Sequence, residues 1–293
     1  MKQNRIFKIS LLLMLTIVLI FGTAQGFAST PKVAKSTVKT KISTVDWNMM
    51  SITGSPTANQ KRTNTNLYWF KFAFLDKSMS SGTLQEICSN EFNQLKSDMK
   101  MPGYFFPYYT SPACPRGEKL GMGVIYRGKR IASWQKVFKD QTYKTHSYGN
   151  YARGMVCVKH LYLEKQISTC VTHIAFDTKV KHYIRDNALG GRQLKESIIY
   201  STLFSLGAGG KSNVADITFL NGDFNQFPSA VAKNTSGFKS AVVAPTHNAL
   251  LWTGPKYQLD YIMVPSGLTS SPAFKPVCNL GSDHCMIGAS VWH

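Results

Sequence analysis

Short apolar segments with the composition of β-strands recur through most of the chain and are interleaved with a few segments of helical periodicity. Strands are expected where β-branched and aromatic residues gather, at 41–48, 123–126, 131–137, 155–161, 167–174, 217–220, 258–264 and 286–291. Apolar spacing predicts helices over 87–99 and 193–204, and glycines at 207–210 end the second. No Gly/Ser- or Pro-rich linker divides these segments. The pattern therefore predicts one large domain with the architecture of a two-sheet α/β sandwich.

Three further segments have weaker patterns. Residues 59–66 are polar and are expected to form a loop. Residues 67–75 are apolar and aromatic, which fits either a helix or a buried strand. Residues 104–115 are rich in Pro and Tyr, so they are predicted to be a loop or an irregular sheet edge.

The N-terminus has the order of a secretory signal peptide: Lys2, Arg5 and Lys8, then an apolar run over 9–21, then small residues up to Ala28. We expect cleavage after residues 1–28, a disordered lead-in over 29–41 and a domain over 42–293. The alternative is a retained membrane anchor, but the apolar run is short for a full span and no second span follows. The mature protein is therefore predicted to be secreted, extracellular or periplasmic, with no stable membrane span after processing.

Six cysteines in an exported chain favour disulfides over a metal site, and no CxxC pair occurs. Cys157 and Cys170 flank a predicted hairpin turning at 162–165, which places their sulfurs opposite each other. Cys278 and Cys285 could close a small loop, leaving Cys88 with Cys114. The sequence by itself leaves the pairing open.

The chain is strongly basic, with 34 Lys and Arg against 15 Asp and Glu and a formal net charge of +19. Such a field attracts polyanions, which include nucleic acid, anionic lipid headgroups and acidic wall polymers. The alternative is a solubility feature with no specific partner. Charge alone indicates association and not chemistry.

Polar residues crowd the ends of several predicted strands, where a rigid strand delivers a side chain into a loop. Taken singly, each group has an ordinary explanation as a turn, a surface pair or a half-buried histidine. Their joint occurrence favours a functional site. The groups are Trp47-Asn48, Gln85-Glu86, Thr172-His173, Gly222-Asp223-Phe224-Asn225, Leu259-Asp260-Tyr261 and Ser282-Asp283-His284.

In this order the groups resemble the motifs of the endonuclease/exonuclease/phosphatase (DNase-I-like) superfamily over nearly all of the mature chain. GDFNQFP, LDYIMV and SDH are most similar to secreted nucleases and to the catalytic subunit of cytolethal distending toxin. The resemblance implies a four-layered α/β sandwich of two packed, mostly antiparallel sheets flanked by helices. It places the site at one rim of the two sheets.

The resemblance also implies roles for the motif residues. Glu86 would be the main Mg²⁺ ligand, with Asn48 and Asp283 close to the metal, and Mn²⁺ or Ca²⁺ are alternative ions. Glu118 and Glu91 are alternatives to Glu86 as the ligand. Hard divalent cations prefer such oxygen donors and neutralise charge on a phosphodiester.

The remaining motif residues would act on the scissile phosphate. Asp223 would orient or deprotonate the attacking water, and Asn225 would hold a phosphate oxygen. His284, oriented by Asp260, would polarise the phosphate or transfer a proton, because a carboxylate behind an imidazole fixes its tautomer. His173 and Arg153 would contact the phosphate from the other side.

We therefore predict a secreted, Mg²⁺-dependent endonuclease that hydrolyses DNA. Aromatic and basic residues at 104–109 and 143–153 suit a groove for sugar-phosphate, although edge-strand packing explains them equally well. The alternatives are a lipid or phosphoinositide phosphodiesterase, a toxin-like catalytic subunit, and a non-catalytic binding protein on the same scaffold. The sequence gives no support for a partner subunit.

Overall fold

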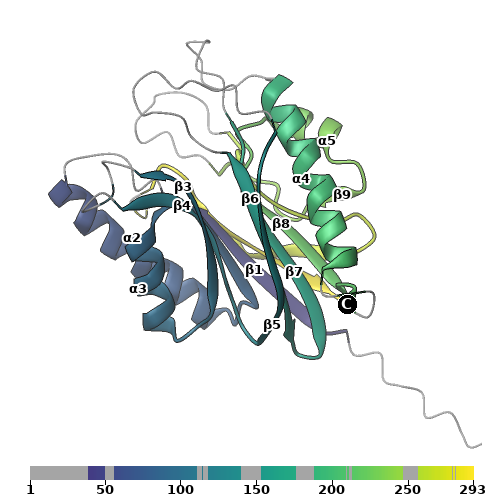
Figure 1. The fold of residues 1–293 in the computed structure, drawn as a ribbon, viewed down its shortest axis with the longest axis horizontal. Helices are drawn as coiled ribbons and strands as arrows, with labels where there is room; N and C mark the ends of the chain where they lie inside the picture. Colours follow the sequence, from purple (N-terminus) through teal and green to yellow (C-terminus); the bar gives the residue numbers. More distant parts are fainter. Residues whose placement is uncertain are drawn as a thin grey trace, which may run out of the picture. The chain divides into compact units, whose positions relative to one another are not determined.

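Two six-stranded sheets pack face to face, and helices cover their outer faces (Figure 1). The first sheet has the order β11-β12-β1-β2-β4-β3 and the second has the order β5-β6-β7-β8-β10-β9. Neighbouring strands are antiparallel except for β1–β2 and β7–β8, which are parallel. The prediction of a four-layered sandwich of mostly antiparallel sheets is confirmed.

The strands of the first sheet are β1 (Lys41–Asn48), β2 (Ser81–Cys88), β3 (Gly103–Thr110), β4 (Lys119–Tyr126), β11 (Thr269–Val277) and β12 (Met286–Trp292). Those of the second are β5 (Lys129–Val137), β6 (Gly154–Tyr162), β7 (Lys165–His173), β8 (Ile217–Asp223), β9 (Phe238–Ser240) and β10 (Asp260–Pro265). Helices α2 (Pro56–Asp76) and α3 (Ser89–Met99) cover the first sheet, and α4 (Ala188–Gly207) and α5 (Pro228–Asn234) cover the second (Figure 1).

The computed structural model describes residues 39–49, 56–110, 114, 118–139, 153–175, 188–208, 210, 213–246, 257–278, 280 and 282–293. The predicted signal peptide over 1–28, most of the lead-in over 29–41 and the aromatic segment over 143–151 lie outside these residues. Lys41, which ends the predicted lead-in, is already the first residue of β1. Within the described part, no helix is both long enough and apolar enough to cross a bilayer.

The period-two alternation of β1 explains how the layers are held together. Val45 and Trp47 belong to the apolar core that also contains Phe70 and Phe74 of α2. The alternate residues of β1, including Thr44, point toward the second sheet, where Asn221 Nδ2 of β8 donates to Thr44 Oγ1 at 3.2 Å. Over residues 44–48, one face of the strand is therefore apolar and the other is polar and buried.

One sequence expectation is wrong and two alternatives are settled. Residues 59–66 are not a loop, because α2 runs from Pro56 to Asp76 and 67–75 forms its second half. Buried contacts of Leu67, Phe70 and Phe74 fix this helix, and its polar half continues from them. The segment 104–115 was expected to be a loop or irregular edge; residues 103–110 form β3 at the edge of the sheet, with a register shift at Pro107. Proline is tolerated there because an edge strand has amide groups that need no ladder partner.

All six cysteines are paired, as Cys88–Cys114, Cys157–Cys170 and Cys278–Cys285. Cys157 and Cys170 are directly opposite in the register of β6 and β7, as the hairpin predicted. The two pairings that the sequence left open are thereby assigned.

Candidate active site

Strand register brings the predicted site residues to one rim of the sandwich. In the second sheet, Asp223 at the end of β8 lies opposite His173 of β7 and Asp260 of β10. In the first sheet, Asn48 ends β1 beside Gln85 of β2. Parallel strands carry their carboxyl ends to the same edge, so the two parallel pairs put these residues together.

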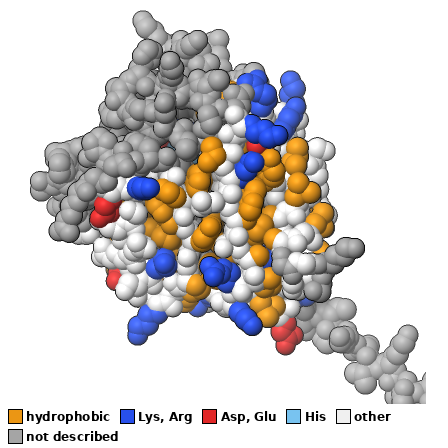
Figure 2. Space-filling model, viewed as in Figure 1, with side chains coloured by type: hydrophobic (Ala, Val, Ile, Leu, Met, Phe, Trp, Pro, Cys, Tyr) orange, Lys and Arg blue, Asp and Glu red, His pale blue; other side chains and the backbone are white. Residues whose placement is uncertain are grey.

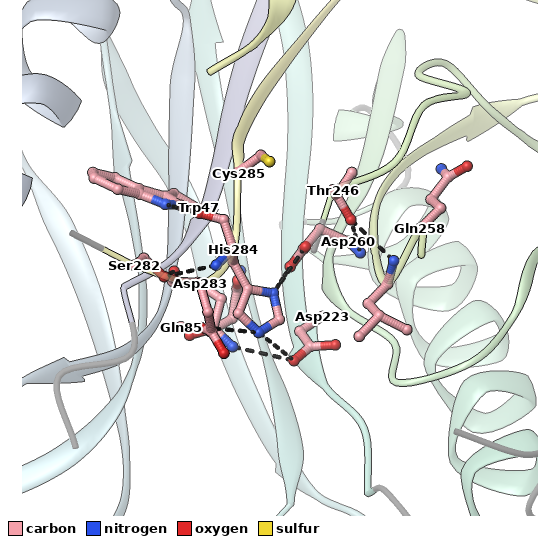
Figure 3. Close-up of polar contacts among 12 residues, drawn as sticks. Trp47, Gln85, Asp223, Thr246, Gln258, Asp260, Ser282, Asp283, His284 and Cys285 are labelled. Atoms are coloured by element: carbon pink, nitrogen blue, oxygen red, sulfur yellow. Dashed lines mark hydrogen bonds and ion pairs between the residues drawn. The ribbon is translucent and has the colours of Figure 1, made fainter. Parts of the chain in front are cut away.

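Asp223 is the centre of this rim and is buried. Its Oδ2 atom lies 3.4 Å from His173 Nε2 and 3.9 Å from His284 Nε2, and it accepts a hydrogen bond from Asn48 Nδ2 at 3.1 Å. Its Oδ1 accepts from the backbone amide of Asn225 at 2.9 Å. Both carboxylate oxygens therefore accept a hydrogen bond. Figure 3 shows His284 from the first sheet's side beside one of them.

The end of β8 and the turn that follows it suit Gly and Asn. Gly222 has φ +143°, and a Cβ there would lie 1.8 Å from the carbonyl oxygen of Thr172, so no other residue fits. Asn225 has φ +45°, a left-handed conformation that Asn tolerates better than most residues. Its Nδ2 donates to the carbonyl of Ile174 at 3.0 Å, which fixes the orientation of the amide.

His284 is held between two carboxylates (Figure 3). Its Nδ1 lies 2.9 and 3.0 Å from the oxygens of Asp260, and its Nε2 faces Asp223. Burial alone would lower the pKa of His284, but Asp260, Asp283 and Asp223 outweigh it and raise that pKa well above its usual value. The imidazole is therefore held as a cation at neutral pH.

The residues around His284 are tied to β1. Ser282 Oγ donates to the carbonyl of Asn48 at 2.7 Å and accepts from the amide of His284 at 3.1 Å. Trp47 Nε1 donates to the carbonyl of His284 at 3.1 Å. Asp283 Oδ1 lies 3.8 Å from His284 Nε2. These contacts bring Asp283 into the cluster.

Glu86 reaches the cluster from a bulge in β2. The pairing of β2 with β4 shifts register between Leu84 and Ile87, and Glu86 has φ +51°. A left-handed glutamate is strained, and such strain concentrates at functional sites. The bulge places Glu86 Oε1 3.7 Å from His173 Nε2.

The two alternatives to Glu86 make their contacts at the start of α3. Glu91 Oε2 accepts from the amide of Cys88 at 3.1 Å, and Glu118 Oε2 accepts from the amide of Asn90 at 2.9 Å. Both carboxylates satisfy amides at the start of α3, where a helix leaves its donors unpaired.

The charges of the site distinguish the roles of its acids. Burial would raise the pKa of Asp223, but the hydrogen bond from His173 and the positive charge of His284 lower it below its usual value. Burial, with Asp223 and Asp283 nearby, raises the pKa of Glu86 to about 7, although His284 and Arg153 oppose this. Asp223 is therefore ionised. Glu86 has too little positive charge around it to offset its burial, so its pKa stays above the usual value.

Arg153 and His173 complete the rim. Arg153 is buried and close enough for its charge to lower the pKa of both Glu86 and His173. Burial is the larger cause for His173, and its pKa falls to about 4. A neutral His173 can donate from Nε2 to the carboxylate of Asp223.

The donor set fits a divalent cation. Ligand atoms of Asp223, Asp260 and His284 lie within 4.8 Å of one another and could hold an ion. Since Asp260 is engaged by His284 Nδ1, the oxygen donors better placed for this are Asp223 and the predicted ligands Asn48, Glu86 and Asp283. Glu86 is buried beside two other carboxylates, and this raises its pKa to about 7. A bound cation would offset the burial and the repulsion between the carboxylates.

Two supporting residues were missed by the sequence analysis. Thr246 Oγ1 accepts from the amides of Leu259 and Asp260, both at 2.9 Å, and so fixes the start of β10. No sequence motif marks Thr246. Asp46 is fully buried and accepts from Gln85 Nε2 at 2.6 Å, which anchors β2 next to Glu86. Its position in β1, where alternate residues point inward, could have identified Asp46 from the sequence.

Comparison with known proteins agrees with this architecture. No family model matches the sequence. A search of curated proteins also found no match. Solved structures match by fold. The catalytic domain of human Nocturnin with bound sulfate has a TM-score of 0.62 and 18% identity, covering 86% of this chain and 95% of that one.

Two further structures match over a similar share. The endonuclease/exonuclease/phosphatase family protein from Leptotrichia buccalis has a TM-score of 0.58 and 16% identity, covering 85% of this chain and 99% of that one. D. rerio TDP2 complexed with single-strand DNA product has a TM-score of 0.56 and 14% identity, covering 86% and 98%.

The two packed sheets, with polar residues gathered at one rim, define an α/β sandwich with a buried acid–base cluster. This is the fold of the endonuclease/exonuclease/phosphatase (DNase-I-like) superfamily. At these identities the likeness shows the fold, and the activity has to be argued from the site.

Proposed function

We propose that the chain is a secreted, divalent-metal-dependent phosphodiester hydrolase that cleaves DNA as an endonuclease. The observation that carries the proposal is the placement of two imidazole Nε2 atoms, of His173 and His284, against one oxygen of the ionised Asp223. Hydrolysis of a phosphodiester needs a base for water and donors for the phosphoryl oxygens, and this cluster offers both.

Asp223 is proposed to orient or deprotonate the attacking water. Its carboxylate is ionised and held by Asn48 Nδ2 and the Asn225 amide, so it can accept a hydrogen bond from the water without reorganising. Its lowered pKa keeps it ionised but makes it a weak base, so positioning of the water is its main proposed role.

His284 is the cationic donor. Asp260 fixes the ring through Nδ1, which leaves the Nε2 proton for a phosphoryl oxygen or the leaving oxygen. The same carboxylate stabilises the imidazolium. His173, Asn225 and Arg153 lie around the same rim and are proposed to contact the phosphate.

Glu86, Asn48 and Asp283 would hold the cation, for which Mg²⁺ is proposed and Mn²⁺ or Ca²⁺ are the alternatives. When bound, the ion neutralises charge on the non-bridging oxygens and stabilises the leaving oxygen. The donor oxygens come from a strand end, a bulge and a disulfide-closed loop, so three elements of the fold set their spacing.

Nucleic acid is proposed as substrate because the chain is strongly basic: its formal net charge is +19, and about +16 without the three basic residues of the predicted signal peptide. Figure 2 shows Lys and Arg spread over one face of the described part, with few Asp and Glu. Phosphate contacts dominate the affinity of proteins for nucleic acid. A structural relative of the same fold is complexed with single-strand DNA product, which also supports the proposal.

Secretion is proposed from the N-terminal pattern together with three disulfides, which persist in oxidising compartments. Cleavage after residues 1–28 would leave the lead-in and the catalytic domain over 42–293. Intact mass of the secreted form checks this, with an expected N-terminus between residues 27 and 31 and no free thiol. A retained Met1 or six free thiols would contradict it.

The substrate is tested by assaying duplex DNA, sphingomyelin and a phosphoinositide in parallel, with His284→Ala as the inactive control. We expect DNA cleavage that needs a divalent cation, with an apparent KM that rises steeply with salt as counterion release predicts. Turnover of a lipid with intact DNA would make the protein a lipid phosphodiesterase. No turnover of any of the three would favour a binding protein.

A further inference from the structure

A short disulfide loop encloses two of the site residues. Cys278 and Cys285 are seven residues apart, and Asp283 and His284 lie between them. Cys285 follows His284 directly, and β12 begins at the next residue. The covalent bond therefore closes the loop that presents Asp283 and His284 to the rim.

The two sides of the loop differ in how firmly the sheet holds them. On the far side, Cys285 is buried, its amide donates to the carbonyl of Thr246, and β12 pairs with strands on both sides. On the near side, Cys278 follows β11, an edge strand whose register with β12 shifts at Phe274 and again before Val277. The disulfide links this irregular edge strand to Cys285, on the side of the loop that the sheet holds more firmly.

The three disulfides also differ in their access to solvent. Cys88, Cys114, Cys157, Cys170 and Cys285 are all buried, with at most 2% of each residue exposed. Cys278 is half-buried. Thiol–disulfide exchange requires a thiolate to reach one sulfur, so the Cys278–Cys285 bond is the one open to attack.

We propose that the Cys278–Cys285 disulfide is a positioning element of the active site and makes the activity sensitive to small thiol reductants. The inference rests on the proposed function, because it assigns Asp283 to the cation and His284 to the phosphate. Contacts of Ser282, Trp47 and Thr246 keep the reduced loop near its place, so the fold persists. What is lost is the precision with which Asp283 and His284 are held.

The redox step balances with two equivalents of thiol. A small thiolate attacks the Cys278 sulfur and forms a mixed disulfide, and Cys285 leaves as a thiolate that takes a proton. A second thiol attacks the sulfur of the bound small molecule, which releases Cys278 as a thiol and the reductant as its disulfide. The protein gains two electrons and two protons.

A misplacement of about 1 Å in a reacting group can cost on the order of 100-fold in rate. We therefore expect reduction of this bond to lower kcat by about 10- to 100-fold. The Mg²⁺ concentration for half-maximal activity should rise, because Asp283 is on the loop. The KM for DNA should change little, since no Lys or Arg lies between the two cysteines.

The test uses the full mature protein and graded dithiothreitol. Alkylation and mass spectrometry follow each thiol while hydrolysis of DNA and of bis(p-nitrophenyl) phosphate is measured. Cys278→Ala/Cys285→Ala should have the low kcat without reductant and should not respond to it. The control Cys157→Ala/Cys170→Ala removes a fully buried bond between β6 and β7 and should keep the reductant response of the wild type.

Hydrogen exchange of the loop separates this proposal from the function on which it rests. Reduction should speed exchange at the amides of His284 and Cys285 while the β12 amides stay protected. Loss of both hydrolytic activities in untreated protein would defeat the proposed function, and the exchange result would still decide the positioning. Reduction of Cys278–Cys285 with unchanged kcat and unchanged exchange would overturn the proposal, as would earlier reduction of another pair.

Discussion

Two buried histidines, at opposite ends of the space between the two sheets, differ in charge. One is a cation and the other is neutral. His284 lies at the active-site rim with Asp260, Asp283 and Asp223 around it, and its pKa is raised well above the usual value. His160 lies on β6, six residues beyond Gly154, which faces His173 in the register, so it is roughly 20 Å from the rim. Burial lowers the pKa of His160 to about 4, opposed only by its hydrogen bond to the carbonyl of Arg127.

In these two rings, the nearby carboxylates and not burial decide the charge. Burial lowers the pKa of both rings, and only His284 has acids to reverse it. His160 packs instead against the ring of Tyr126, with centroids 5.2 Å apart. We therefore expect His284 to determine the rate, and His160 to affect only stability.

The largest effect should come from His284→Ala. Loss of an electrostatic or acid–base group costs about 10²–10⁴-fold in kcat. The change leaves Asp260 buried without its partner, so the melting temperature should fall as well. Circular dichroism must show folded protein at the assay temperature, and turnover near wild type would remove His284 from the mechanism.

At the other end, His160 should make stability depend on pH. Folded His160 stays neutral, whereas the unfolded chain takes up a proton below about pH 6.5. Its depressed pKa therefore leaves stability complete above pH 6.5 and reduces it as pH falls toward 4, by up to about 3 kcal/mol. His160→Asn keeps a donor for Arg127 and cannot titrate, so its urea midpoint should vary less over this range, with kcat at pH 7 unchanged. An identical pH profile would show that His160 does not govern it.

Glu86→Gln tests the cation side of the rim. The amide keeps the shape of the side chain and removes the charge, so the Mg²⁺ concentration for half-maximal activity should rise by roughly 10- to 100-fold. Glu91→Gln is the matched control, because Glu91 lies at the start of α3. An equal shift in both variants would contradict the assignment of Glu86 as the ligand.

The smallest effect should come from Lys159→Met, next to His160. Lys159 Nζ donates to the carbonyls of Ser205, Ala208 and Asn213 at 2.9, 2.8 and 2.7 Å, which satisfies the C-terminal end of α4. Methionine fills the space without a donor and should cost about 1–2 kcal/mol of unfolding free energy. Denaturant titration measures this loss of stability. A lower kcat in folded protein would mean that the end near His160 is coupled to the rim near His284.

Much of this arrangement could be predicted from the sequence because the information was local. Asp223 ends β8 directly after Gly222, which admits no Cβ, and Asn225 follows in the turn, so the motif is also a backbone requirement. Asp260 begins β10 and His284 lies two residues before β12, and period-two patterning identifies both apolar strands. Their clustering at one rim was predicted, and the structure shows it; their catalytic roles remain predictions.

The elements that were missed depend on contacts between distant segments. The prolines of β11 suggest turns, and only an edge position allows this segment to be a strand. The polar half of α2 is helical because its other half packs against β1. Thr246 carries no motif, and its role depends on the position of β10. None of these could be read from the local sequence.

The central claim is that Asp260 and His284 act as one unit on the phosphate. The measurement is a double-mutant cycle in kcat with His284→Ala, Asp260→Asn and the double variant, each checked for folding at the assay temperature. The account predicts that both single variants are slow and that the double variant is little slower than His284→Ala, because the second change removes a group with nothing left to orient. Independent, multiplying losses in the double variant, or a fast His284→Ala, would contradict it.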